Sequence, residues 1–272
     1  MGTDKMTKIF NKTIERIKTF FKYRELFFQL VSKNIKLKYR RSVFGYLWTV
    51  LNPLLSMLVI YTVFSQLFSR SIPNFPIYIL SGQLIFHFMT GAVSTAMSSI
   101  TGHAALLKKI YIPKYIFTLS QVTSELIVFF FSLISFLIVV IISKTPITIR
   151  YLYVIIPIIQ LYVFCIGLGL FLAQTAVFFR DIYYIWHIVS TAWMFLSCIF
   201  YSVDILPENV KHIITHYNPM YFYITMFRNF TMGAPGMGSL DLVIRGAVAA
   251  VSALFLGLVT FSINKNKFIL YI

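Results

Sequence analysis

The chain has 272 residues, of which 58% are hydrophobic and only 12% are charged. Its mean hydropathy is +0.80, whereas soluble globular domains are usually about 45–50% apolar and about 25% charged. This composition excludes a soluble enzyme, a disordered protein and a nucleic-acid-binding protein built on a basic surface, and it predicts an all-α integral membrane protein.

Positive charge is concentrated in the N-terminal part of the chain. The net charge is +16, and residues 1–47 hold 12 of the 24 Lys and Arg residues. Basic segments of membrane proteins gather on the cytoplasmic side, where anionic lipid head groups attract them. We therefore expect residues 1–47 to form a cytoplasmic region and residues 48–272 to form a single membrane domain.

Residues 24–47 have the pattern of an amphipathic helix lying at the cytoplasmic interface. On a helical wheel, the apolar arc holds Phe27, Phe28, Leu30, Val31 and Ile35, and the polar arc holds Glu25, Gln29, Ser32, Lys33, Lys36 and Arg40. Lys38 and Arg41 interrupt the apolar side. Two interpretations stay open: a helix that only anchors the chain to the membrane surface, and a helix that also contacts a cytoplasmic partner.

Six segments are long and apolar enough to cross a bilayer, because a helix needs about 20 apolar residues to span a hydrocarbon core of about 30 Å. They are residues 49–69, 76–98, 116–142, 151–177, 184–203 and 242–263. If the N-terminus is inside, the inner segments carry 18 Lys and Arg residues and the outer segments carry five, Arg228 among them. The positive-inside rule then predicts a multi-pass protein with both termini in the cytoplasm.

Two connecting segments carry more pattern than plain loops. Residues 102–113 lie between Gly102 and Pro113 and mix apolar with basic residues, which predicts a short helix on the inner side. Residues 204–232 predict a short helix from Glu208 to His216, followed by an apolar run, 220–230, that is too short to span. This outer stretch is either a hairpin that covers the mouth of a pathway or a cap with no gating role.

The sequence predicts no catalytic or metal site. It contains no G-x-x-x-x-G-K-[ST] motif, so ATP-driven work would need an ATPase on another chain. The five histidines show no grouping of metal ligands, and Cys165 and Cys198 lie in apolar runs. For Glu125, inside the third span, we favour a buried structural hydrogen bond over a direct role in transport. Aromatic residues make up 18% of the chain and could line a path for a glycan, because sugars stack on aromatic faces.

Three groups of residues resemble a known family. They are the run from Lys36 to Trp48 (KLKYRRSVFGYLW) with Leu51-Asn52-Pro53, the run from Val177 to Ile182 (VFFRDI), and Leu206-Pro207 with Tyr217-Asn218-Pro219-Met220. In this order and at these separations, they resemble the membrane subunit of ABC exporters of lipid-linked polysaccharides such as O-antigen, capsule and teichoic acid. The resemblance covers nearly the whole chain.

The resemblance implies six transmembrane helices, a homodimer and a separate cytoplasmic ABC ATPase dimer that binds ATP and Mg. The chain itself would hold no cofactor and catalyse no reaction. Its substrate would be a polyprenyl-(pyro)phosphate-linked polysaccharide or teichoic acid, which moves from the inner to the outer face of the bacterial cytoplasmic (inner) membrane. Membrane lipid is an expected partner, and nucleic acid is not.

The resemblance also implies roles for groups of residues. The helix at 24–47 would be an interface helix, and 206–232 would be the outer gate. The coupling helix that docks on the ATPase would be Gly102, His103, Ala104, Ala105, Leu106, Leu107, Lys108, Lys109, Ile110 and Tyr111. The basic residues that attract the lipid head group would be Lys33, Lys36, Lys38, Arg40 and Arg41. The channel between protomers would be lined by the first, second and fifth spans, with Tyr61, Phe64, Phe86, Trp193, Phe200 and Tyr201. Arg180 and Asp181 would fix the inner loop by hydrogen bonds.

Three other functions stay in view. A type-2 ABC exporter for a drug or simple lipid would share the fold and need the same ATPase. A membrane-embedded enzyme acting on a polyprenyl phosphate would need clustered Asp, Glu or His at one membrane face, and the sequence lacks that cluster. An ion-coupled carrier is disfavoured by the shortage of ionisable residues within the spans and of internal repeats.

Overall fold

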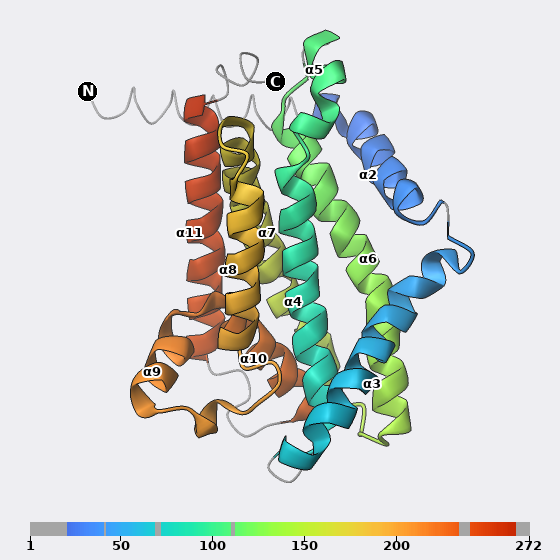
Figure 1. The fold of residues 1–272 in the computed structure, drawn as a ribbon, viewed down its shortest axis with the longest axis vertical. Coiled ribbons are helices and arrows are strands. Elements are labelled where there is room, and N and C mark those ends of the chain that lie inside the picture. The colour runs from blue at the N-terminus through green and yellow to red at the C-terminus, as the bar shows by residue number, and fades with distance from the viewer. Residues whose placement is uncertain (1–20, 41, 69–71, 110–111, 234–239, 265–272) are drawn as a thin grey trace.

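The computed structural model describes residues 21–40, 42–68, 72–109, 112–233 and 240–264 (Figure 1). In this part of the chain, every regular element is a helix. Short 3₁₀ helices, Gly45–Leu47, Thr101–His103, Ile149–Val154 and Val203–Ile205, join or extend the α-helices. The α-helices are α2 (Arg24–Tyr39), α3 (Trp48–Phe68), α4 (Phe75–Met97), α5 (Ala104–Lys109), α6 (Tyr115–Ile142), α7 (Ile155–Phe178), α8 (Ile182–Leu196), α9 (Glu208–Tyr217), α10 (Pro219–Met232) and α11 (Leu240–Asn264).

Five helical segments in the described residues are long and apolar enough to cross a membrane. They are Gly45–Gln66, Phe75–Met97, Tyr115–Ile142, Ile149–Phe178 and Leu240–Ile263. They agree closely with five of the six expected spans, and the all-α expectation is confirmed for the described residues.

The fifth expected span, residues 184–203, differs from the other five. Its helix, α8, has 15 residues and ends at Leu196. At a rise of about 1.5 Å per residue, it is about 22 Å long, which is less than a hydrocarbon core of about 30 Å. The chain turns at Cys198, whose φ of 51° lies in the left-handed region. Residues 197–202 of the expected span therefore form a turn and not a helix.

The core of the bundle is built around α4. Of the most apolar window of α4, 72% is buried, compared with 6% for the window of α3. Opposite α3, α7 and α11 pack closely because of two glycines. A Cβ at Gly167 would overlap the backbone of Ala253, and one at Gly257 would overlap the carbonyl oxygen of Gly167. Small residues allow this close backbone approach between membrane helices.

The two ends of the bundle carry different short elements (Figure 1). At one end, α5 projects beyond α4, and α2 lies along the side of α6. At the opposite end, α9 and α10 connect α8 to α11. The chain turns sharply between α2 and α3, so that these two helices form a V at one side of the bundle.

Candidate functional site

The predicted coupling segment is helical in the structure. A 3₁₀ turn at Thr101–His103 leads directly into α5. His103 fixes this turn, because its Nδ1 lies 2.8 Å from the carbonyl oxygen of Ser99 and its ring packs 4.7 Å from that of Phe117. Lys108 and Lys109 are exposed on α5. Two predicted members of the segment, Ile110 and Tyr111, lie outside the described residues.

One apolar cluster joins α5 to α2 and α6; we call it the α2–α6 cluster. Its buried members are Phe27, Leu30, Val31, Ile112, Ile116 and Phe117. Leu106 and Leu107 of α5 pack against it. The predicted apolar face of α2 is thus confirmed for its buried members, whereas Phe28 faces outward and is 66% exposed. A displacement of α5 would be transmitted to α2 and α6 through this shared packing.

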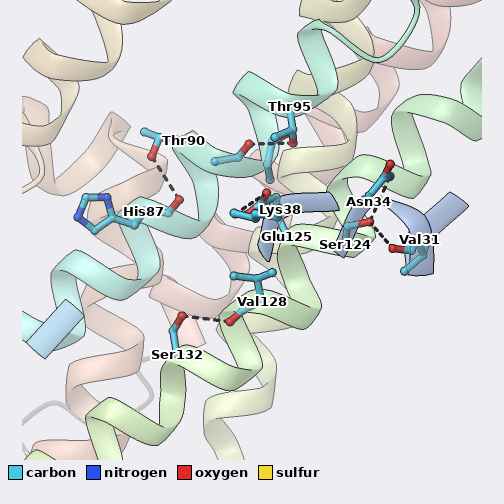
Figure 2. Close-up of polar contacts among 12 residues, drawn as sticks. Val31, Asn34, Lys38, His87, Thr90, Thr95, Ser124, Glu125, Val128 and Ser132 are labelled. Carbon is cyan, nitrogen blue, oxygen red and sulfur yellow. Dashed lines mark hydrogen bonds and ion pairs between the residues drawn. The ribbon is translucent and has the colours of Figure 1, made fainter. Parts of the chain in front are cut away.

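The second half of α2 is held to α6 by polar contacts (Figure 2). The Lys38 ammonium donates to both carboxylate oxygens of Glu125, at 2.8 Å each. One turn earlier, Asn34 donates to the Ser124 hydroxyl at 3.4 Å. The Glu125 side chain is only 10% exposed, and that of Lys38 is 43% exposed. Burial, the nearby Glu125 carboxylate and Tyr46 together raise the pKa of Tyr39 to about 12.

The other members of the predicted basic group have different surroundings. Lys33, Lys36 and Arg40 are exposed on α2, and Arg41 lies outside the described residues. Lys38 is the member of this group that forms an ion pair with a described residue. Hydropathy places Glu125 in a span but does not indicate its partner Lys38, which is 87 residues earlier in the chain.

A stripe of polar residues follows one face of α4 and continues into the turn before α5. Its members are His87, Thr90, Ser94, Ser98 and Thr101, and their spacing of three or four residues places them on one side of a helix. His87, Ser94, Ser98 and Thr101 are exposed. The helix that carries this α4 stripe, α4, packs against both α3 and α8 (Figure 1). The His87 ring points away from the Lys38–Glu125 pair (Figure 2).

The α4 stripe was not among the features predicted from the sequence. The helical spacing of its residues was the signal that could have found it. In α8, the indole Nε1 of Trp186 donates to Ser94 at 3.1 Å. One turn beyond His87, the buried Gln83 has a side-chain oxygen without a hydrogen-bond partner among the described residues. Exposed polar groups at membrane depth are tolerated where they meet water or another protein chain.

The six aromatic residues predicted to line the channel differ in their contacts and in their burial. Phe64 stacks on Phe200, with ring centroids 6.2 Å apart, near the exposed Tyr61 and the partly buried Tyr201. Phe86 is 3% exposed and belongs to the central core. Trp193 donates its Nε1 to Asn218 at 2.8 Å. The structure therefore brings the rings of Phe64 and Phe200 into contact. Phe86 and Phe200 belong to one core cluster, and Trp193 and Tyr201 pack against it.

Arg180 and Asp181 form the turn between α7 and α8. The backbone carbonyl of Arg180 accepts from the N–H of Tyr183 at 3.3 Å, and that of Asp181 accepts from the N–H of Tyr184 at 3.0 Å. Both residues are exposed. An open groove of about 440 Å³ lies beside the turn, and it is lined by Thr101, Ala176, Arg180, Tyr183 and Tyr184.

At the opposite end, α9 and α10 differ in how firmly they are packed. In α9 only Ile214 is buried, whereas ten residues of α10 are buried. An apolar groove of about 400 Å³ lies between α9 and the end of α8, with Trp193, Val210 and Tyr217 among its lining residues. Asn218 joins α10 to the end of α8, because its side chain caps α10 at the N–H of Met220 and donates to the carbonyl of Leu196.

Arg228 fixes α10 to the rest of the bundle. Its guanidinium donates to the carbonyl oxygens of Cys198 at 3.0 Å, Tyr78 at 3.0 Å and Ile199 at 3.1 Å. It also lies 3.4 Å from the centre of the Tyr78 ring. From the sequence, Arg228 was expected among the basic residues of an outer segment. In the structure Arg228 is buried, with 7% of the residue exposed. Gly82 makes room, since a Cβ there would lie 2.8 Å from the guanidinium.

Comparison with known proteins places this chain in a family. The family model described as "ABC-2 type transporter" matches residues 25–231. The chain is 31% identical to the O-antigen export system permease protein RfbA of Myxococcus xanthus, over 79% of this chain and 83% of that protein. It is 27% identical to a protein of the same name from Klebsiella pneumoniae, over 76% and 80% of the two chains. It is 26% identical to the capsule polysaccharide export inner-membrane protein CtrC of Neisseria meningitidis, over 73% and 76%. The chain belongs to the ABC-2 type transporter family.

Proposed function

We propose that this chain is the membrane subunit of an ATP-driven exporter of a lipid-linked polysaccharide. Two relatives are named as O-antigen export system permease proteins, and a third is named as a capsule polysaccharide export inner-membrane protein. The substrate would be a polyprenyl-(pyro)phosphate-linked glycan or teichoic acid. It would move from the inner to the outer face of the bacterial cytoplasmic membrane.

The observation that carries the proposal is the α2–α6 cluster. Leu106 and Leu107 of α5 pack against residues of α2 and α6, while Lys108 and Lys109 remain exposed. A helix with an apolar side anchored in the membrane domain and a basic side facing outward suits a contact with a cytoplasmic partner. In this proposal, the partner is an ATPase dimer that binds ATP and Mg.

The α4 stripe would form part of the wall of the translocation path. A glycan is rich in hydroxyl groups, so its path needs hydrogen-bonding groups as well as aromatic faces. The stripe is exposed on α4, and a second copy of the chain would enclose it. Of the predicted aromatics, Tyr61 and Phe64 lie on α3, which packs against α4.

The proposed topology has six crossings and two cytoplasmic termini. The end of the bundle with α5 would face the cytoplasm, and α9 and α10 would face outward. The fifth crossing would consist of α8 together with the turn at Ser197–Ser202, which leads toward α9.

The test is a pull-down of the tagged full chain in mild detergent, followed by mass spectrometry. We expect an ATPase with a phosphate-binding loop in near-equal amount, because α5 is the helix through which the chain binds the ATPase in this proposal. A chain that brings down no ATPase in several detergents, while remaining monodisperse, would contradict the ATP-driven mechanism. Loss of surface glycan on deletion of the gene identifies the substrate class and separates it from a drug or simple lipid.

A further inference from the structure

The two members of the Lys38–Glu125 pair are unequally exposed. The Glu125 side chain is 10% exposed and therefore depends on the pair, because a buried carboxylate without a cation is strongly disfavoured. The Lys38 side chain is 43% exposed, so it is the more accessible member of the pair. An anion that arrives from the surroundings therefore meets the lysine before it meets the carboxylate.

The rest of α2 attracts such an anion to the same membrane surface. Lys33 and Lys36 are exposed on the side of α2 away from Lys38, and Arg40 is exposed just after the helix. Their positive charges raise the local concentration of anionic lipid groups at a membrane surface. A phosphate group carries at least the charge of a carboxylate and offers more acceptor oxygens, so it can compete with Glu125 for the Lys38 ammonium.

The position of the pair links it to the least buried span. The first half of α2 is packed into the α2–α6 cluster through Phe27, Leu30 and Val31. Its second half contacts α6 through the Asn34–Ser124 hydrogen bond and the Lys38–Glu125 pair. The chain then turns into α3, whose apolar window is only 6% buried. Breaking the pair would loosen the end of α2 and the start of α3 together.

We propose that Lys38 is a lipid-phosphate site that Glu125 occupies in the resting protein, and that the phosphate of the lipid carrier displaces Glu125 when the substrate arrives. The identity of the ligand rests on the function proposed above. The Lys38 ammonium gives two of its three N–H groups to Glu125. A phosphate that takes over these two donors breaks the ion pair, so phosphate binding and the ion pair weaken each other by the same factor. Arrival of the substrate would in this way release the α2–α3 corner.

The binding of a polyprenyl pyrophosphate to the purified full chain tests this proposal. The protein is placed in nanodiscs of phosphatidylcholine, and the dissociation constant is measured by native mass spectrometry. Glu125→Gln removes the competitor and keeps the Lys38 cation, and we expect it to bind at least about tenfold more tightly, within the usual range of coupling between sites. Lys38→Gln should weaken binding by a similar factor. Arg24→Gln, an exposed residue at the start of α2, is the matched control and should match the unmodified protein within about twofold.

Lys38→Gln leaves Glu125 without its cation and is open to the objection that it misfolds. The double variant Lys38→Gln/Glu125→Gln removes both charges, and we expect its affinity to equal that of Lys38→Gln, because Glu125 acts only through Lys38. Unchanged or weaker binding by Glu125→Gln would overturn the proposal. So would tighter binding by the double variant, because the effect of Glu125 would then not pass through Lys38.

A further arm separates the two sources of lipid phosphate. Phosphatidylglycerol is added to the nanodiscs at increasing fractions, and the polyprenyl pyrophosphate should stay bound when phosphatidylglycerol is in moderate excess. Displacement at equal concentration would assign Lys38 to bulk anionic lipid and overturn its role for the carrier. None of these measurements needs the ATPase or export, so a failure of the proposed ATP-driven mechanism would be distinguishable from a failure of this site.

Discussion

Arg228 shows how a buried charge can be held without a carboxylate. Three backbone carbonyls accept from its guanidinium, and the Tyr78 ring covers it. These carbonyls belong to the start of α4 and to the turn after α8, so one side chain connects three elements. The carbonyls of Cys198 and Ile199 lie beyond the end of α8, where carbonyls lose their helical partners, and the planar guanidinium can satisfy several acceptors at once.

Replacement of Arg228 by alanine should therefore destabilise the protein strongly. Loss of a buried hydrogen-bonded charge removes its partners' bonds and leaves a cavity, for which we expect about 3–5 kcal/mol. A fluorescence-detected thermal shift in detergent would measure this. Arg245→Ala is the control, because Arg245 pairs with Asp241 at the surface of α11, where such pairs contribute about 0.5 kcal/mol or less. Equal melting temperatures for the two variants would contradict the role of Arg228.

Gly82 gives a second test at the same place. Alanine is the better helix former by about 1 kcal/mol, so Gly82→Ala should stabilise α4 if local propensity decides. Its Cβ would however lie 2.8 Å from the Arg228 guanidinium and 3.0 Å from Ile199, and we expect destabilisation. Gly102→Ala, where nothing lies within 4 Å, is the matched control for melting temperature. A higher melting temperature for Gly82→Ala would show that Arg228 can move aside.

At the scale of single residues, the sequence shows which side chains are charged but not which groups they contact. Glu125 could be placed in a span from hydropathy alone, yet its partner Lys38 interrupts the apolar arc of another helix. Arg228 is a charged residue in a segment that was predicted to lie outside the membrane spans. Nothing in the neighbouring sequence indicates that three distant carbonyls surround it. Contacts over 87 to 150 residues depend on tertiary packing, which has no local sequence pattern.

At the scale of elements, the sequence predicts α9 and α5 well because their ends carry local signals. Pro207 precedes α9 and Glu208 opens it, and Pro113 follows the α5 segment. The end of α8 carries no such signal. The apolar run continues through Cys198, Ile199 and Phe200, so hydropathy extends the span beyond the left-handed turn at which the helix has already ended.

The packing of α5 leads to a prediction about Leu107. Leu107 contacts the α2–α6 cluster, while the exposed Lys108 and Lys109 remain free to meet a partner. Leu107→Asp should therefore leave the ATPase bound but separate ATP hydrolysis from export, because a buried carboxylate disrupts the packing that carries the movement. We expect near-normal ATPase content and at least about a tenfold loss of export. For a helix contact, that factor corresponds to about 1.4 kcal/mol of coupling.

Leu107→Met is the control for this experiment, since it conserves volume and apolarity and should export normally. The measurement pairs co-purification of the ATPase with the amount of glycan at the cell surface. Normal export by Leu107→Asp would show that the cluster does not transmit movement. Loss of the ATPase from the complex would instead place Leu107 in the docking contact itself.

At the scale of the whole molecule, the distribution of exposed polar residues distinguishes the faces of the bundle. The outer faces of α6 and α11 expose Phe130, Ile134, Val248 and Phe255, as lipid-facing helices do. The exposed face of α4 instead carries His87, Ser94 and Ser98. Composition predicted a membrane protein correctly, but only the folded arrangement shows that these polar groups stay exposed on a helix that packs against α3, α6, α7 and α8.

This contrast leads to a prediction about water access. A cysteine at Ser94 should react with a membrane-impermeant maleimide, because thiols react as thiolates and these form in contact with water. A cysteine at Ser252, an exposed residue of α11 among apolar neighbours, should react at least about tenfold more slowly in a bilayer, because the charged form is disfavoured there. Cys165 and Cys198 are buried and should give little background. If the cysteine at Ser94 reacted as slowly as the one at Ser252, the α4 stripe would face lipid. The proposed path would then have to run elsewhere in the bundle. Labelling of Ser94→Cys that falls when the carrier-linked glycan is supplied would place the substrate against α4.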